Sequence, residues 1–307
     1  MSFSTGTDRS EPDRGPTLYV ANFDFDDRLA KPAMTSLPMN LRTINARLAP
    51  MLQGLCGPDD AVALPGDWVK DAGRFERVEP WGVEPHVLAW LRTAGAGEAS
   101  LSLLPDPAIV RIVNSRQWQW ETEQALDLTS GEVSFCDSSE AVWNAVDSFA
   151  DRTRGWVLKA DHGGSGRGLR FGAGSPPEAV VRWADGCVGR GLGMTVEPRD
   201  DRAREYSAHL SVTDRGVTFE GICFLHSTPT GRFRSVEPLK HLSPALTEAV
   251  PVWTAVGEKA WSQGYRGPLG IDAAAAFGVV ERPVRDVNAR WTMGRLALTL
   301  GRKVSNP

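Results

Sequence analysis

The sequence WVLKADHGGSGRGLRFG, residues 156–172, places a lysine at the end of an apolar run and follows it with a glycine-rich segment. Successive side chains of a strand point to opposite faces, so Trp156, Leu158 and Ala160 share one face. Lys159 therefore lies on the other face, just before the glycines. A lysine beside bare backbone amides is typical of a phosphate-binding site. A lysine that extends to solvent is the alternative.

The glycine-rich segment GGSGRG, residues 163–168, lies between two predicted strands, GWVLKAD and LRF. It lacks the GK[ST] ending of a Walker loop and does not match GxGxxG, so a dinucleotide-binding fold fits poorly. The chain also contains neither HRD nor DFG, the motifs of protein kinases. We interpret the segment as a hairpin lid over a nucleotide, and an ordinary turn is equally consistent with it.

A second group of polar residues lies in VRDVNAR, residues 284–290. Residues two apart on a strand face the same way, about 6–7 Å apart, so Asp286, Asn288 and Arg290 are expected on one face. Asp272 lies on the preceding strand, and a hairpin brings it alongside. Carboxylate and amide oxygens suit Mg²⁺, whereas the alternative is a solvated polar strand face.

The clearest β pattern is EYSAHLSV, residues 205–212, in which apolar and polar residues alternate. Glu205 and His209 share the polar face, and VTFEGICFLH is the predicted partner strand. We interpret His209 as a hydrogen-bonded histidine within the sheet. The basic segment 224–241 is expected to form a loop over an acceptor site, or else a solvated loop.

The remaining patterns alternate strands and helices, which indicates an α/β protein. The expected elements are a strand at 17–23, a helix at 38–55, a short strand at 60–66, a helix at 83–94, a strand that runs into a helix near Asn114 over 109–126, a strand at 193–198, and helices at 137–153, 176–189, 244–264 and up to about residue 301.

The composition is that of an ordinary globular protein, with 307 residues, 41% of them hydrophobic and 23% charged. The net charge of −4 argues against a nucleic-acid surface, which usually carries a basic excess. The four cysteines are widely spaced, so we expect reduced core thiols. No signal peptide and no run near the roughly 20 apolar residues of a membrane helix is present, so we expect a cytoplasmic protein without a membrane partner.

Taken in order, the lysine with GGSGRG, then TVEP, EYSAHL, GYRGPLGIDA and RDVNARWTMG resemble the ATP-grasp superfamily, of the carboxylate–amine/thiol ligase type. The resemblance covers about residues 105–300. It implies α+β subdomains that grip ATP, behind an N-terminal three-layer α/β domain. The expected boundaries are a disordered lead at 1–15, the N-terminal domain at 16–105, a subdomain with the glycine-rich lid at 106–195 and a subdomain with the metal site at 196–307.

The resemblance also implies roles for individual residues. Lys159 contacts the α- and β-phosphates, Arg290 lies near the transferred phosphate or the acceptor carboxylate, and Glu205 holds the ribose hydroxyls. The lid residues are Gly163, Gly164, Ser165, Gly166 and Gly168; Glu197 and Pro198 lie at the adenine; and the metal ligands are Asp272, Asp286 and Asn288.

Two residues depart from the family pattern. Asp286 stands where the family has glutamate, and one methylene less can shift the metal. Arg116 stands where the family often has a lysine before the central helix, which keeps the charge but changes its geometry. The alternative for Arg116 is a surface arginine.

The resemblance implies an ADP-forming ligase that requires ATP and Mg²⁺, with two ions expected and Mn²⁺ as a substitute. ATP activates a small-molecule carboxylate as an acyl phosphate, which an amine then attacks. A homodimer is expected. The alternatives are a small-molecule kinase on the same scaffold and a nucleotide-binding partner protein without catalysis.

Overall fold

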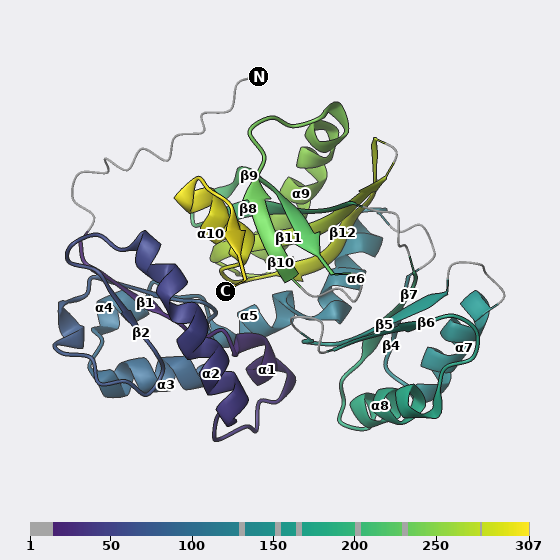
Figure 1. Cartoon of the computed structure of the whole chain (residues 1–307), viewed down its shortest axis with the longest axis horizontal. Coiled ribbons are helices and arrows are strands. Elements are labelled where there is room, and N and C mark those ends of the chain that lie inside the picture. The colour runs from purple at the N-terminus through teal and green to yellow at the C-terminus, as the bar shows by residue number, and fades with distance from the viewer. Residues whose placement is uncertain are drawn as a thin grey trace.

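The computed structural model describes residues 15–128, 133–150, 155–163, 168–199, 204–228, 233–276 and 278–306. Within them the strands form three sheets, one from each successive part of the chain. Figure 1 shows the N-terminal sheet at the lower left, the C-terminal sheet above the middle and the central sheet at the lower right. None of the described helices combines the length and hydropathy that crossing a membrane requires.

The N-terminal sheet is parallel, with the strand order β2-β1-β3. Parallel strands need cover on both faces, and here Leu18 and Val20 pack with α3 while Tyr19 joins the core shared with the C-terminal sheet. The predicted strands and helices of this region are confirmed, but β3 was not predicted because RVEP is short and half charged. The elements are β1 (Thr17–Val20), α1 (Phe25–Ala30), α2 (Met39–Leu48), a 3-10 helix at Ala49–Leu55, β2 (Ala61–Ala63), a 3-10 turn at Ala72–Arg74, β3 (Arg77–Pro80), α3 (Pro85–Ala94) and α4 (Glu98–Leu101).

The prediction of a strand before Asn114 is wrong, because this segment is the helix α5 (Pro107–Val113). The side chain of Asp106 accepts a hydrogen bond from the backbone N–H of Ala108, and Pro107 occupies the first turn, where its missing N–H costs nothing. Val110 and Val113 are fully buried three residues apart, so the β-branched run lines one helix face.

The central sheet is antiparallel, with the order β4-β7-β5-β6, and α7 and α8 pack on one of its faces. Trp156 and Leu158 point into that helix layer, while Lys159 lies on the opposite face, as the alternation predicted. The elements are α6 (Arg116–Ala125), β4 (Ser134–Cys136), α7 (Ser139–Ala150), β5 (Trp156–Ala160), β6 (Leu169–Gly172), α8 (Glu178–Val188) and β7 (Met194–Pro198).

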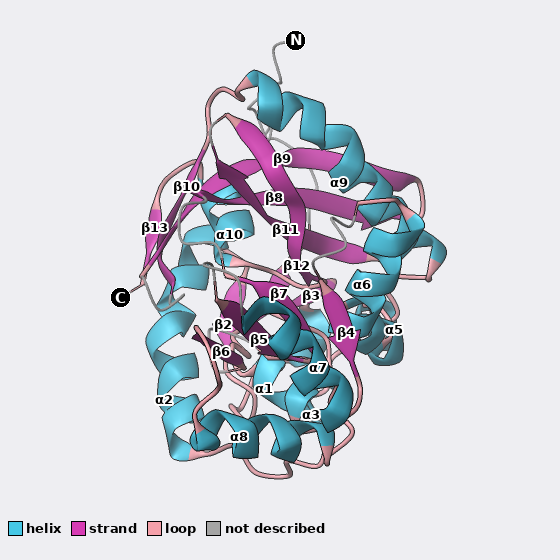
Figure 2. Ribbon diagram, turned by 90° about the vertical axis from the view of Figure 1, so that its right-hand side faces the viewer, coloured by secondary structure: helices cyan, strands magenta, loops and turns pink. Residues whose placement is uncertain are grey.

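The C-terminal sheet has the order β12-β11-β8-β9-β10-β13, and its neighbouring strands are antiparallel. Figure 2 shows α9 across one face and α10 on the other. The expected loop at 224–241 is wrong for its described part, because two hydrogen-bonded strands occupy most of it. The elements are β8 (Arg204–Thr213), β9 (Gly216–Ser227), β10 (Phe233–Pro238), α9 (Pro244–Ser262), β11 (Gly267–Ala276), β12 (Val279–Asn288), α10 (Met293–Leu300) and β13 (Val304–Ser305).

One hydrophobic core runs through both the N-terminal and the C-terminal parts of the molecule. Phe23, Leu48 and Trp81 belong to the same cluster of buried residues as Leu210 on β8 and Trp253 on α9. The central sheet packs around a separate cluster with α7 and α8. The four cysteines are free thiols, three of them buried, as predicted.

Trp253 tests this shared core. It is fully buried, its ring stacks on Phe219 with centroids 6.4 Å apart, and its Nε1 donates to the carbonyl oxygen of Pro283 at 2.7 Å. Replacement by alanine leaves a cavity and an unpaired carbonyl, so Trp253→Ala should lower the free energy of unfolding by about 3–5 kcal/mol in urea titrations. Trp261→Ala on the same helix, where the side chain is 40% exposed, is the control and should cost much less. Equal losses would contradict the assignment.

Candidate functional site

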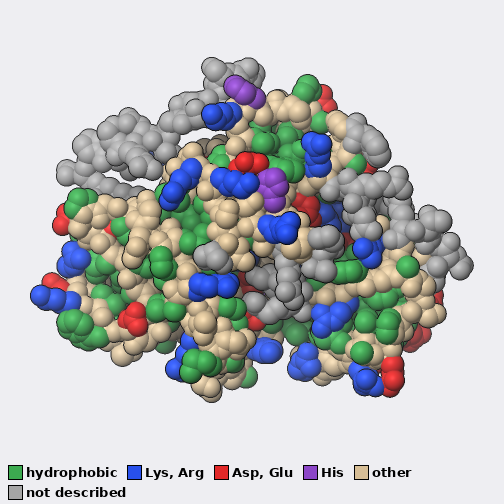
Figure 3. Space-filling model, viewed as in Figure 1, with side chains coloured by type: hydrophobic (Ala, Val, Ile, Leu, Met, Phe, Trp, Pro, Cys, Tyr) green, Lys and Arg blue, Asp and Glu red, His purple; other side chains and the backbone are tan. Residues whose placement is uncertain are grey.

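A cavity of about 1300 Å³ lies between the three sheets. Small-molecule sites usually measure about 300–1,000 Å³, so this one has room for more than one substrate. Arg47, Arg199, Arg204 and Arg234 are among its lining residues. Figure 3, which shows the molecule from the same side as Figure 1, has several basic side chains (blue) over the middle of the visible face. Although the chain is acidic overall, this concentration of guanidinium groups favours anionic ligands.

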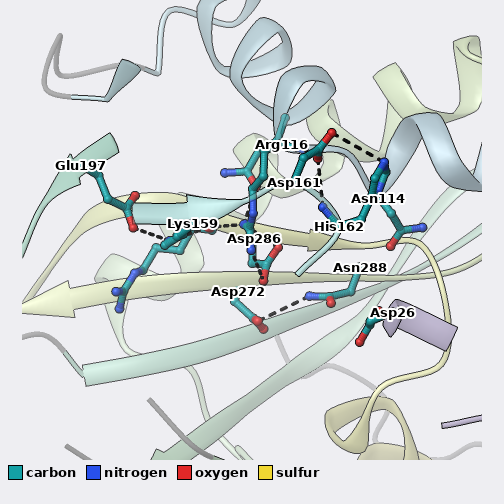
Figure 4. A network of polar contacts seen from close by, with 12 residues as sticks. Asp26, Asn114, Arg116, Lys159, Asp161, His162, Glu197, Asp272, Asp286 and Asn288 are labelled. Carbon is teal, nitrogen blue, oxygen red and sulfur yellow. Dashed lines mark hydrogen bonds and ion pairs between the residues drawn. The ribbon is translucent and has the colours of Figure 1, made fainter. Parts of the chain in front are cut away.

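Buried charges tie the central sheet to β12, as Figure 4 shows. The Nζ atom of Lys159 forms an ion pair with Glu197 on β7 and donates to the carbonyl oxygen of Arg285 at 3.2 Å. Glu197, only 1% exposed, also pairs with Arg282 on β12. Val157 on β5 pairs with Glu197 on β7, so these two side chains lie on one face of the sheet. Lys159 follows Val157 by two residues and therefore lies on the same face.

The surroundings of Lys159 favour an anion. Burial lowers the pKa of Lys159 well below its usual value, and the neighbouring guanidinium groups of Arg282, Arg285 and Arg116 lower it further. Burial also lowers the pKa of Arg282 to about 10, although the nearby Glu123 carboxylate opposes this shift. Bound phosphates would supply negative charge beside these cations and stabilise them.

Arg116 is held in the cavity wall at the start of α6. Ser115 caps the helix by accepting the backbone N–H of Trp118, and Asp161 accepts the backbone N–H of Arg116 at 2.6 Å. The guanidinium reaches Asp286 on β12, with Nη1 2.7 Å from Oδ1 and Nη2 3.1 Å from Oδ2. Arg116 is 7% exposed, so the interpretation as a surface arginine is wrong.

The three residues predicted as metal ligands come together on β11 and β12. Asp272 lies opposite Asp286 in the strand register, and its Oδ2 accepts a hydrogen bond from Asn288 at 3.4 Å. Burial, then the charge of Asp286, raises the pKa of Asp272 to about 7. Two close carboxylates fit Mg²⁺, which would relieve this repulsion, whereas the Asn288 amide turns its N–H group to Asp272 and its oxygen to Arg290 and would have to rotate to bind the ion. Among the described residues, neither this site nor any other brings together three His, Cys, Asp or Glu side chains as metal ligands.

Arg290 connects this group to the N-terminal part. Its guanidinium makes two hydrogen bonds to Asp26 on α1, at 2.9 and 3.0 Å, and a third to the Asn288 side-chain oxygen at 2.9 Å. The next residue, Trp291, donates its backbone N–H to the carbonyl oxygen of Trp81. No sequence motif marks Asp26, because only the folded chain brings residues 26 and 290 into contact.

Gly163 and Gly168, the described glycines of the segment 163–168, lie side by side at its two ends. A Cβ atom on Gly163 would lie 2.8 Å from the Cα atom of Gly168, so larger residues cannot pair here without moving the backbone. The backbone N–H of Ala160 donates to the carbonyl oxygen of Gly168 at 2.8 Å. Gly164, Ser165 and Gly166, also predicted for the lid, lie outside the described residues.

Most of the predicted site residues that the structure describes line this one cavity. Glu205 does so, and Arg285 donates to its carboxylate at 3.0 Å. Glu197 and Pro198 are not among the lining residues, and Glu197 instead forms the buried ion pairs described above. The lining residues among those predicted are Arg116, Lys159, Gly163, Gly168, Glu205, Asp272, Asp286, Asn288 and Arg290.

His209 is a buried structural residue. Its ring packs against Gly294 at the start of α10, where a Cβ atom would overlap the imidazole, and its Nδ1 lies 3.5 Å from the Thr292 hydroxyl. Burial, then the positive charge of Arg295, lowers the pKa of His209 to about 3.

Comparison with models of known protein families finds no match, and comparison with curated protein sequences finds none either. Solved structures do match over most of the chain. D-cycloserine synthetase DcsG is 14% identical with a TM-score of 0.57, over 94% of this chain and 99% of that one. D-alanyl-alanine synthetase A from Vibrio cholerae is 13% identical with a TM-score of 0.57, over 92% and 90%. N5-carboxyaminoimidazole synthetase from Staphylococcus aureus, solved with ADP, is 10% identical with a TM-score of 0.56, over 91% and 71%.

These structures are ATP-grasp proteins, and the chain has the ATP-grasp fold. The resemblance inferred from the ordered motifs is thereby confirmed for the fold, including the N-terminal α/β part, which precedes the central and C-terminal sheets in the chain.

Lys159 tests the nucleotide site. The substitution Lys159→Met keeps most of the side-chain volume but removes one charge-assisted phosphate contact, worth about 1.5–3 kcal/mol. Calorimetry with a non-hydrolysable ATP analogue should therefore show a Kd raised roughly 10- to 150-fold. Lys259→Met, at an exposed position on α9, should leave the Kd unchanged. An unaltered Kd in Lys159→Met would remove the lysine from the site.

Because His209 is buried, the free energy of unfolding should decrease at acidic pH. The unfolded chain binds a proton on this histidine near pH 6.5 and the folded chain only near pH 3, so stability is full above pH 6.5 and falls as the pH drops towards 3. The loss should be about 1.4 kcal/mol per pH unit within that window. Urea midpoints at pH 7.5 and 5.0 should differ less in His209→Gln than in the wild type. His241→Gln, at an exposed position, should behave like the wild type.

Proposed function

We propose that the protein is an ATP-dependent, ADP-forming ligase that activates a small-molecule carboxylate as an acyl phosphate and joins it to an amine. The observation that carries this proposal is the single cavity that holds a buried lysine and arginine cluster beside two carboxylates and an amide on adjacent strands. The names of the structural neighbours, several of them synthetases, support the same class of reaction.

In this proposal the chain acts by positioning and by charge neutralisation. Lys159 and Arg116 hold the phosphates, and Arg290 orients the acceptor carboxylate or the transferred phosphoryl group. Asp272, Asp286 and Asn288 would hold Mg²⁺, two ions in our proposal, which supplies positive charge for the phosphate oxygens. The acyl phosphate forms when the substrate carboxylate oxygen attacks the γ-phosphorus and ADP leaves. This activation requires no protein nucleophile.

The N-terminal wall of the cavity indicates one property of a substrate. Phe23 and Trp81 lie with ring centroids 4.4 Å apart, and Leu29, Ile44 and Leu48 continue the same wall. Burial of apolar surface against this wall is favourable by about 25 cal/mol per Å². We therefore infer that the carboxylate or the amine carries an apolar group, as in an amino acid with an apolar side chain.

One observation keeps the non-catalytic alternative open. Arg116 contacts both oxygens of Asp286, so a candidate metal ligand already has a cationic partner. A binding partner without turnover would retain the nucleotide cluster and this ion pair. A kinase would use the same cavity but transfer phosphate to a hydroxyl group.

Trapping with hydroxylamine separates these functions. The protein is incubated with Mg²⁺, ATP, hydroxylamine and a pool of L- and D-amino acids and small carboxylates, and ADP and hydroxamate are measured. The ligase should release ADP and hydroxamate in equal amounts, because hydroxylamine attacks the acyl phosphate. A phosphoester without hydroxamate would establish the kinase, and AMP with pyrophosphate would contradict the proposed chemistry.

Asp286→Asn is the matched variant for this assay. It keeps the shape of the side chain but removes the charge, so turnover should fall by at least about 100-fold while urea unfolding confirms a folded protein. Turnover at the wild-type rate would exclude Asp286 as a metal ligand.

A further inference from the structure

His162 lines the cavity, but the function proposed above gives it no role. It lies between Asp161 and Gly163, and Asn114 and Arg116 line the same cavity. Its side chain is only 3% exposed, and its backbone has a φ of 54°, in the left-handed region that side chains other than glycine rarely adopt. Such strain persists where the surroundings enforce it, often at functional sites.

Asp161 fixes the orientation of this histidine. One carboxylate oxygen accepts the backbone N–H of both His162 and Arg116, at 3.1 and 2.6 Å. The other carboxylate oxygen lies 3.6 Å from Nε2 of the imidazole. A carboxylate beside one ring nitrogen favours the tautomer with the proton on that nitrogen. Asp161 therefore favours the Nε2–H form, which leaves a lone pair on Nδ1; Figure 4 shows Asp161 and His162 beside Asn114 and Arg116.

The Nδ1 atom of His162 is buried, and none of the described residues forms a hydrogen bond with it. A buried acceptor without a donor costs free energy, which an incoming N–H group recovers. The cavity has a second histidine, His226, but its Nε2 is bonded to Glu237 at 2.9 Å and its side chain is 35% exposed.

The charges around His162 keep the imidazole neutral. Its pKa is lowered to about 4, mainly by burial; Asp161 and Asp26 oppose this shift, and Arg111 and Arg116 add to it. Asp26, the residue that binds Arg290, lines the same cavity as His162.

From this geometry we infer that His162, oriented by Asp161, is the proton acceptor for the attacking amine. The inference rests on the proposed ligase function. The amine attacks as its free base, after its ammonium form has lost one proton to water. As the C–N bond forms, the nitrogen becomes strongly acidic and gives one further proton to Nδ1. The C–O bond to phosphate then breaks, inorganic phosphate leaves, and the imidazolium returns the proton to phosphate or water. Atoms and charge balance without any further reactant.

The ratio of two products tests the role of His162. Hydroxylamine also traps acyl phosphates in free solution, where water takes its proton, whereas the bound amine attacks as its free base inside the cavity and passes its proton to His162. His162→Gln should therefore retain hydroxamate formation and the Kd for the ATP analogue, but lose amide formation by at least about 100-fold. His86→Gln, at a position away from the cavity lining, should keep the wild-type ratio.

The outcomes separate the two proposals. If the wild type forms neither amide nor hydroxamate, the ligase function fails; if it forms both and His162→Gln keeps their ratio, only the role of His162 fails. The same loss in His226→Gln but not in His162→Gln would also overturn the inference.

A second measurement needs no substrate. In the full-length protein labelled with ¹⁵N-histidine, NMR at pH 7.5 should show the neutral Nε2–H form of His162, and Asp161→Asn should weaken this preference. An Nδ1–H tautomer or an imidazolium at that pH would overturn the inference, whatever the products are.

Discussion

The contact between the central sheet and β12 is made of buried charges, and the site depends on them. Lys159 and Arg116 are buried and Arg282 is half-buried, so each cation needs an anionic partner within reach. Glu197 and Asp286 provide such partners within the chain. The same side chains that hold the two sheets together therefore also set the charge that a ligand meets. A ligand that exchanges places with a carboxylate must offer similar negative charge in the same geometry.

Local periodicity was enough to predict much of this arrangement. Alternation along β5 placed Lys159 away from the helix layer, and the two-residue spacing on β12 placed Asp286 and Asn288 beside Asp272, because strand geometry is independent of the rest of the fold. The same reasoning failed for α5, because the apolar residues Val110 and Val113 are as consistent with a buried strand as with a helix. The hydrogen bond by which Asp106 caps the first turn favours the helix. Contacts between distant segments, such as Asp26 with Arg290, leave no local signal.

The two departures from the family pattern turn out to be neighbours in space. Arg116 and Asp286 are far apart in the sequence, yet the forked guanidinium meets both oxygens of the shorter carboxylate. A longer acid at position 286 would need to displace that guanidinium. The sequence showed each departure separately as a weakness of the assignment, whereas the structure shows them as one compatible pair.

The core shared by the N-terminal and C-terminal parts has a mechanical consequence. Phe23, Trp81, Leu210 and Trp253 belong to one packed cluster, so separating these parts would expose apolar surface and break the bond from Trp291 to Trp81. The central sheet has its own core and meets the rest largely through polar groups. Moving the central sheet away from the rest would therefore expose less apolar surface than separating the N-terminal and C-terminal parts.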